Sequence, residues 1–171
     1  MKAPLPPIVV MGVQGSGKST IGTLLARRLG VRFIDGDRLH PDENIVRMAA
    51  GVPLTDEQRR PWLQEVGRVL ADGSSSGIVA ACSALKREYR DLLRESAPDL
   101  FVVDAEGPME LVEARIMVRE HEFMPHELLS SQYAILEPLA ADETGVVVDI
   151  SRAPAEIVDD VVATLAAAPS V

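Results

Sequence analysis

The sequence predicts an α/β protein built on a parallel sheet of five strands flanked by helices. Short runs rich in β-branched residues recur along the chain, and helical patterns fill the spaces between them. This alternation is typical of a parallel sheet that is buried on both faces. A glycine-rich loop also separates the first apolar run from the first helical pattern, which is the order of a strand-loop-helix unit.

The five predicted strands are short and contain few polar residues. Such runs indicate strands in the interior of a sheet, because both faces of each strand are covered by helices. The strands are expected at Ile8–Met11, Arg32–Ile34, Ile78–Cys82, Leu100–Asp104 and Val146–Ile150.

The helices between these strands have recognisable start and stop signals. The first is expected to run from the glycine-rich loop to about Leu29 and to end at Gly30. Another begins at Thr55, where Thr55 and Gln58 match a capping box, and continues to about Ala71. Two more are expected over residues 42–50, before Gly51, and over residues 155–168.

The composition indicates one domain, over residues 1–171, with 47% hydrophobic and 25% charged residues. A formal charge of -9 argues against a nucleic-acid partner, because phosphate backbones are bound by basic surfaces. No apolar stretch is long enough to predict a membrane span. Cys82 is the only cysteine, which excludes an internal disulfide and favours a cytoplasmic protein.

The glycine-rich loop is a complete Walker A sequence, Gly12-Val13-Gln14-Gly15-Ser16-Gly17-Lys18-Ser19. Its glycines let successive N–H groups point at phosphate oxygens, and the following helix adds the positive end of its dipole. Lys18 is expected to reach the β- and γ-phosphates, and the Ser19 hydroxyl to hold Mg²⁺. The nucleotide-binding residues expected here are Gly12, Gln14, Gly15, Ser16, Gly17, Lys18, Ser19 and Thr20.

Two carboxylates follow the second predicted strand, where the carboxyl ends of parallel strands face the ligand crevice. Asp35 is expected in the Mg²⁺ shell, and Asp37 is expected to accept the proton of a substrate hydroxyl. The alternative for both is a solvated Asp-Gly turn. His40 has two candidate roles, a hydrogen bond to substrate or a part in the turn.

Two sets of basic residues recur at helical spacing. Lys86, Arg90 and Arg94 share one helix face, and like charges at this spacing repel unless an anion or an acid lies nearby. They predict either anion binding or a solvated face of ion pairs. Arg115 and Arg119 form another such pair, expected either to clamp phosphates under a lid or to complement a helix dipole.

Several blocks of the sequence are similar to the bacterial gluconate kinases. The similarity extends over nearly the whole chain, from Met11 to Ile150, and departs from the family at Glu122, where a histidine is usual. The blocks are the Walker A loop, Asp35-Gly36-Asp37, Leu39-His40-Pro41, Pro53-Leu54-Thr55-Asp56, Pro61-Trp62-Leu63, Cys82-Ser83-Ala84-Leu85-Lys86, Ser131-Gln132-Tyr133 and Leu136-Glu137-Pro138.

The resemblance implies a P-loop kinase fold of the nucleoside-monophosphate-kinase-like class, with a substrate-binding segment at about 37–65 and a lid at about 119–132. It implies transfer of the γ-phosphoryl group of ATP, with Mg²⁺, to the 6-hydroxyl of D-gluconate, and a homodimer. The product would enter the pentose phosphate or Entner-Doudoroff route. The alternatives are a kinase for shikimate or another sugar acid, and a non-catalytic ATP-binding regulator.

The roles that the resemblance implies divide into three groups. The catalytic residues would be Lys18, Asp37 and Arg119, with Asp35 as the rival of Asp37 for the proton of the substrate hydroxyl. Arg115 and Arg119 would meet the phosphates, Arg152 would line the adenine, and Ser19 and Asp35 would hold the metal. Gluconate would be bound by Asp37, Arg38, His40, Arg47, Lys86 and Arg90.

Overall fold

The fold is described from a computed structural model, which covers residues 4–119 and 126–168. Its centre is a five-stranded parallel sheet in the order β2-β3-β1-β4-β5. The strands are β1 (Ile8–Met11), β2 (Arg32–Asp35), β3 (Ile78–Ala81), β4 (Phe101–Glu106) and β5 (Gly145–Asp149). The predicted α/β class is therefore confirmed, and each predicted strand overlaps an observed one.

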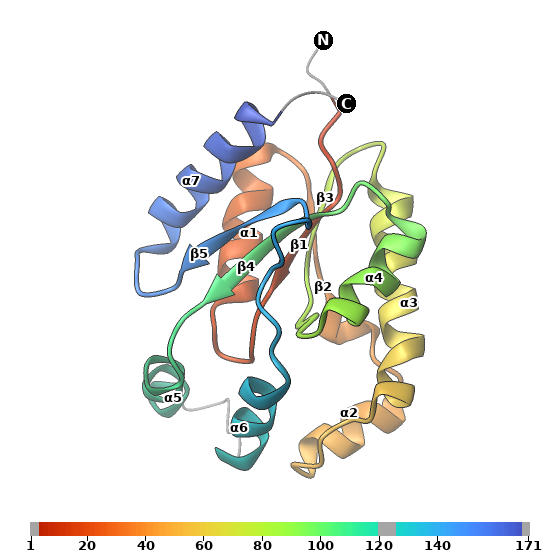
Figure 1. The fold of residues 1–171 in the computed structure, drawn as a ribbon, viewed down its shortest axis with the longest axis vertical. Coiled ribbons are helices and arrows are strands. Elements are labelled where there is room, and N and C mark those ends of the chain that lie inside the picture. The colour runs from red at the N-terminus through yellow and green to blue at the C-terminus, as the bar shows by residue number, and fades with distance from the viewer. Residues whose placement is uncertain (1–3, 120–125, 169–171) are drawn as a thin grey trace.

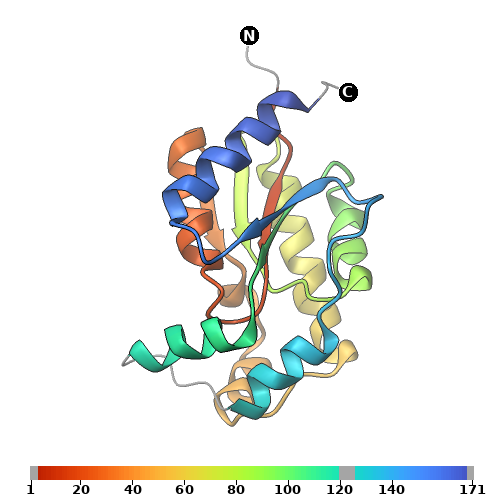
Figure 2. The ribbon, with the colours of Figure 1, turned by 60° about the vertical axis from the view of Figure 1, so that its left-hand side comes forward.

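Helices cover both faces of the sheet (Figure 1). One face carries α1 (Lys18–Leu29) and α7 (Pro154–Ala167), and the other carries α3 (Asp56–Gly73) and α4 (Arg87–Ser96). The remaining helices gather at the end toward which the strands point, as Figures 1 and 2 both show. They are α2 (Asp42–Ala49), α5 (Met109–Val118) and α6 (His126–Ile135), and a 3-10 turn spans Gly36–Leu39.

The helix ends follow the signals in the sequence. Gly30 closes α1 with φ 71°, and its N–H donates to the carbonyl groups of Ala26 and Arg27. Thr55 and Gln58 form the capping box at the start of α3. This helix continues to Gly73, two residues past the predicted end. The helix α6 lies in the second half of the predicted lid, and residues 120–125, which include Glu122, are outside the described residues.

The core is formed where helices press on the sheet. All four residues of β1 are at most 1% exposed, because β1 lies at the centre of the sheet and is covered on both faces. Trp62 from α3 and Cys82 after β3 are also buried. Burial and the nearby charge of Asp37 raise the pKa of Cys82 to about 12.

All strands run in the same direction, so their carboxyl ends share one edge of the sheet. The Walker A loop follows β1 there, Asp35 ends β2, and the segment from Cys82 to Lys86 follows β3. Within residues 4–119 and 126–168, no helix is both long and apolar enough to cross a bilayer.

Candidate functional site

The Walker A loop has the backbone of a phosphate cradle. Gly12, Gly15 and Gly17 have φ of 147°, 79° and 94°, a region that side chains disfavour. A Cβ atom added to Gly12 would lie 2.7 Å from Ser16 Oγ, so the loop could not close around a larger residue there. Ser16 Oγ is buried and finds no hydrogen-bond partner among the described residues. An orphaned hydroxyl inside such a cradle fits a site that receives a polar ligand.

The first turn of α1 and the end of β2 bring Ser19 and Asp35 together. Ser19 Oγ lies 3.5 Å from Asp35 Oδ2, and the backbone N–H of Asp37 donates to Asp35 Oδ1 at 3.1 Å. Two adjacent oxygen groups of this kind suit Mg²⁺, which prefers carboxylates and hydroxyls. Asp37 has an exposed side chain on the 3-10 turn that follows. The carboxylate of Asp35 therefore contacts Ser19 and the backbone, whereas the carboxylate of Asp37 is exposed to solvent.

The lysine of the loop and the helix α5 border the same cradle. Lys18 Nζ donates to the carbonyl group of Val13 at 2.9 Å, which turns the side chain back over the loop. A Cβ atom on Gly15 would lie 2.8 Å from Ile116 of α5, so this helix packs directly on the loop. The backbone N–H of Gln14 donates to Oε1 of Gln132, on α6, at 2.8 Å.

A cavity of about 430 Å³ opens beside the loop, between α1, α5 and the segment from β5 to α7. It gathers three arginines that are distant in sequence: Arg115, which donates to the carbonyl group of Ile150, Arg119, and Arg152, which pairs with Asp160. Other lining residues are Ser16, Gly17, Thr20, Ile21, Ala114, Val118, Ile150, Pro154 and Ile157. The lining thus combines apolar side chains with three arginines, which suits a base joined to phosphates.

His40 is buried and directly follows the 3-10 turn that carries Asp37. Its ring stacks on Trp62 with 3.9 Å between centroids, and its Nδ1 lies 3.2 Å from Nδ2 of Asn44. Trp62 Nε1 donates to the carbonyl group of Gly36 at 2.8 Å, so the stack supports the turn that carries Asp37. Burial, together with the charge of Arg59, lowers the pKa of His40 to about 4. His40 therefore supports the turn as a neutral ring, and its hydrogen bond to a substrate stays a prediction.

Lys86 is the residue before α4, at the same edge of the sheet. Its ammonium group contacts both carboxylate oxygens of Asp56, at 3.2 and 3.0 Å, and lies 5.4 Å from the ring centroid of Tyr89. The hydroxyl group of Tyr89 donates to Asp56 and accepts a hydrogen bond from Arg59 at 3.0 Å. The predicted ligands Arg38 and Arg47 have exposed side chains.

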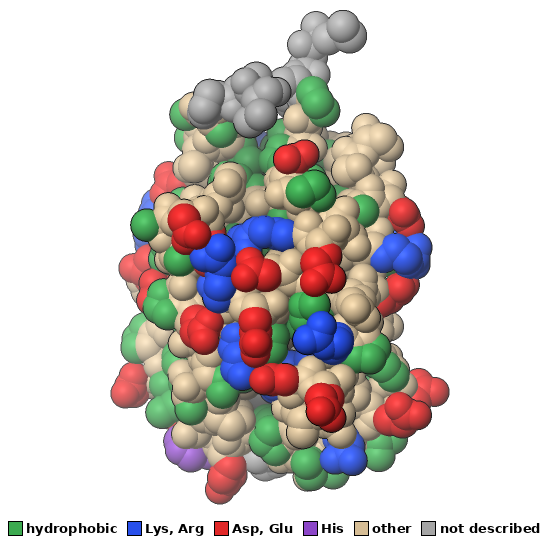
Figure 3. Space-filling model, turned by 45° about the vertical axis from the view of Figure 1, so that its right-hand side comes forward, with side chains coloured by type: hydrophobic (Ala, Val, Ile, Leu, Met, Phe, Trp, Pro, Cys, Tyr) green, Lys and Arg blue, Asp and Glu red, His purple; other side chains and the backbone are tan. Residues whose placement is uncertain are grey.

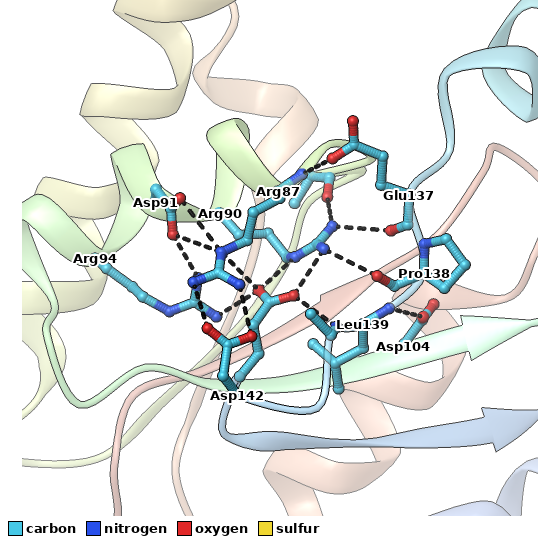
Figure 4. Close-up of polar contacts among 12 residues, drawn as sticks. Arg87, Arg90, Asp91, Arg94, Asp104, Glu137, Pro138, Leu139 and Asp142 are labelled. Atoms are coloured by element: carbon cyan, nitrogen blue, oxygen red, sulfur yellow. Dashed lines mark hydrogen bonds and ion pairs between the residues drawn. The ribbon is translucent and has the colours of Figure 1, made fainter.

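Arg90 is not available to a substrate, which corrects the sequence-based assignment. The residue is 0% exposed, and its three nitrogens donate to atoms of the protein itself (Figure 4). Nε and Nη2 bond the two carboxylate oxygens of Glu143 at 2.7 and 2.8 Å. The other acceptors are the carbonyl groups of Ala84, Leu85, Glu137 and Pro138. Arg90 therefore holds the chain together between α4 and the segment that follows α6.

The prediction of a solvated face of ion pairs describes the rest of α4 better. Arg94 donates to Glu143 at 2.7 Å, and Arg87 pairs with Asp91 and Asp142 at 3.0 and 2.9 Å. Figure 3 shows acidic and basic side chains intermixed on one face of the molecule. Burial alone would raise the pKa of Glu143, but the hydrogen bonds from Arg90, Ala140 and Arg94 lower it to about 2.

Sequence reasoning assigned no role to Gln132 or Glu143. Gln132 stands in the Ser131-Gln132-Tyr133 block, whose similarity to the gluconate kinases was the one available signal. No pattern in the sequence around Glu143 indicates its role, because its partner Arg90 lies 53 positions away. Contacts between such distant residues depend on how the elements pack.

Comparisons with known proteins show what the chain as a whole resembles. The sequence profile described as "Shikimate kinase" matches residues 14–166. The chain is 43% identical over 147 residues to the thermoresistant gluconokinase of Escherichia coli, covering 84% of each chain. It is 41% identical over 170 residues to the probable gluconokinase of Rattus norvegicus, covering 88% of this chain and 92% of that protein.

A solved structure has the same fold. The gluconokinase from Sinorhizobium meliloti superposes with a TM-score of 0.88 at 46% identity, covering 96% of this chain and 94% of the other. The agreement extends over nearly the full length of both chains. The predicted P-loop kinase fold is thus confirmed.

Proposed function

The chain belongs to the shikimate kinase family as a relative of the gluconokinases, and we propose from this that it transfers the γ-phosphoryl group of ATP to D-gluconate. The observation that carries the proposal is the position of the Asp35-Gly36-Asp37 turn, which lies directly beside the Walker A loop. A phosphate cradle next to an exposed carboxylate is the arrangement that hydroxyl phosphorylation requires.

ATP would occupy the loop and the adjoining cavity. The amide groups of the loop and Lys18 would bind the phosphates, and Arg152 and Pro154 would border the base. Arg115, on α5, and Arg119, which directly follows α5, line the same cavity and would stabilise charge on the transferring phosphoryl group.

Ser19 and Asp35 would hold Mg²⁺. The ion would neutralise charge on the phosphate oxygens. Because Asp35 already accepts the N–H of Asp37 and faces Ser19, we assign the metal shell to Asp35 and the substrate hydroxyl to Asp37.

Asp37 would orient the 6-hydroxyl of gluconate and take its proton. The hydroxyl oxygen forms a bond to the γ-phosphorus while the bond from that phosphorus to the leaving ADP oxygen breaks. The products are 6-phospho-D-gluconate and ADP. Lys86, Arg38 and Arg47 would bind the carboxylate and the other hydroxyl groups of the acceptor.

An ADP-release assay with Mg-ATP tests the proposal on a panel of acceptors: D-gluconate, shikimate, other hexonates and no acceptor. Release that depends on D-gluconate supports it, and mass spectrometry of the product locates the phosphate. Release that is equal for all acceptors, or absent for all, contradicts it. Shikimate is the second candidate, because the matching profile is that of shikimate kinase.

We also propose a cytoplasmic homodimer without a nucleic-acid partner. Exposed apolar residues on and after α2, namely Ile45, Val46 and Val52, offer surface for a second copy. The net charge of -9 opposes nucleic-acid binding. Light scattering of the purified protein measures the mass in solution, and a monomeric mass contradicts the dimer.

A further inference from the structure

The side chain of Gln132 reaches the Walker A loop from α6, a helix 118 positions further along the chain. Its Oε1 accepts the backbone N–H of Gln14 at 2.8 Å. The proposed reaction assigns nothing to Gln132. Backbone N–H groups are what this loop offers to phosphate, so a side chain that holds one of them affects how the loop meets its ligand.

The loop needs such support because of its glycines. Gly12, Gly15 and Gly17 all have positive φ, and glycine reaches many other conformations at little cost. If the loop were flexible, nucleotide binding would have to order it, and the lost conformational entropy would weaken the affinity. A hydrogen bond to Gln14, between Gly12 and Gly15, reduces that cost before the nucleotide arrives.

The position of Gln132 is itself determined by contacts along α6. Tyr133, the next residue, donates its hydroxyl to the carbonyl group of Gly107 at 2.9 Å. Beyond the helix, the N–H of Glu137 donates to Leu85 at 2.8 Å, and the carboxylate of Glu137 accepts the N–H of Arg87 at 2.7 Å. Arg90 then bonds the carbonyl groups of Glu137 and Pro138 (Figure 4).

These hydrogen bonds connect the buried pair of Arg90 and Glu143 to the segment after α6, and through α6 to the Walker A loop. We propose that Gln132 is a positioning residue of the nucleotide site, which orders the Gln14 peptide so that the loop is prepared for the triphosphate of ATP. The inference rests on the nucleotide binding in the proposed function, but not on gluconate as the acceptor.

Amide exchange measured by NMR on the full chain tests the hydrogen bond. Gln132→Met keeps the length of the side chain and removes the acceptor, so the amide of Gln14 should exchange faster than in the wild type. Gln132→Glu keeps an acceptor oxygen and should retain the protection. Ser131→Ala is the matched control, because the Ser131 hydroxyl donates to the carbonyl group of Leu128, within its own helix, and not to the loop.

Nucleotide binding and kinetics test the role. One hydrogen bond contributes about 0.5–1.5 kcal/mol, so Gln132→Met should weaken Mg-ATP binding about 2- to 10-fold in calorimetry and raise the KM for ATP similarly. The KM for D-gluconate and the thermal midpoint should stay at their wild-type values. Ser131→Ala should change none of these quantities.

Three results would overturn the inference: unchanged exchange at Gln14, unchanged ATP affinity in Gln132→Met, or equal losses for both substrates together with a lower thermal midpoint. The last result would mean a general structural role. If the wild type does not phosphorylate gluconate but Gln132→Met still weakens ATP binding selectively, the proposed acceptor is wrong and the role of Gln132 stands.

Discussion

The arginines of α4 and the arginines around the 430 Å³ cavity carry the same charge in opposite settings. Arg90 is fully buried, and Arg87 and Arg94 pair with acids of α4 and of the segment before β5. The cavity arginines are Arg115, Arg119 and Arg152, and each of them lines an open space beside the Walker A loop.

The difference shows what makes an arginine available to a ligand. A guanidinium in the interior must be compensated by internal acceptors, since burying an uncompensated charge costs several kcal/mol. Once it is compensated, few donors remain for a substrate. An arginine at the wall of a cavity keeps part of its group in solvent, so a phosphate can take the place of water.

The largest effect on stability is expected when the buried ion pair of Arg90 and Glu143 is broken. Arg90→Met leaves the carboxylate of Glu143 without its main partner, and we expect the free energy of unfolding to fall by about 3–5 kcal/mol. Urea denaturation followed by circular dichroism measures it. The double variant Arg90→Met with Glu143→Leu should be more stable than the single one, because no unpaired charge stays buried.

Arg68 on α3 is the matched control for this experiment. It pairs with Glu65 and Asp72, each at 2.6 Å, but its side chain is 58% exposed. Arg68→Met should leave the free energy of unfolding close to its wild-type value, because exposed ion pairs contribute little to stability. Equal losses for the Arg68 and Arg90 variants would show that burial does not distinguish the two groups.

The next largest effect is expected on turnover, from a substitution in the Walker A loop. Lys18→Ala removes the loop cation, and we expect turnover to slow by about 10²–10³-fold or more, because a preorganised charge on the phosphates is lost. The free energy of unfolding should change by less than about 1 kcal/mol, since the side chain is only partly buried. Turnover at the wild-type rate would contradict the role of Lys18.

The pH dependence of stability sharpens the comparison further. The pKa of Glu143 is lowered from 4.5 to about 2, so its stabilising contribution is complete above pH 4.5 and is lost as the pH falls toward 2. Glu143→Gln should therefore flatten the decline of unfolding free energy in that window. An unchanged slope would mean that Glu143 does not hold its charge in the folded state.

His40 affects the pH dependence of stability in a higher pH range than Glu143 does. Its pKa is lowered from 6.5 to about 4, so the unfolded chain takes up a proton in this range before the folded chain does. The folded state should lose about 2–3 kcal/mol between pH 6.5 and 4. His40→Gln should remove this step, and a step that persists would assign it to other groups.

The smallest effect is expected at the rim of the cavity. Arg152 is 44% exposed and pairs with Asp160 and Glu156. Since an exposed charge contributes little to binding, Arg152→Ala should raise the KM for ATP no more than about 5-fold. Steady-state kinetics at saturating gluconate measure this, and turnover slowed by two orders of magnitude would place Arg152 at the reacting phosphate.

Local patterns predicted most of the fold. The strands, the end of α1 at Gly30 and the capping box at Thr55 follow from interactions between residues close in sequence. The Walker A loop is equally local, because one stretch of chain contains its glycines, Lys18 and Ser19. The nearness of Asp35 to that loop also followed, from the rule that parallel strands share their carboxyl edge.

The arginines were harder to assign, because helical spacing alone does not indicate which acids lie opposite. Lys86, Arg90 and Arg94 follow one pattern at i+4, yet Lys86 faces Asp56 while Arg90 is enclosed by Glu143 and four carbonyl groups. Glu143 comes 53 positions later, from a segment whose place depends on α6 and β5.

The class of fold, the phosphate loop and the edge of the sheet where the site lies could all be inferred from the chain alone, because they depend on hydrophobic periodicity and on short-range backbone chemistry. The packing of distant segments was needed to show that Arg90 is a structural residue, that His40 supports the turn of Asp37, and that Gln132 holds Gln14. The reason is physical: whether a polar group binds a ligand or stabilises the fold depends on the acceptors that distant segments place around it.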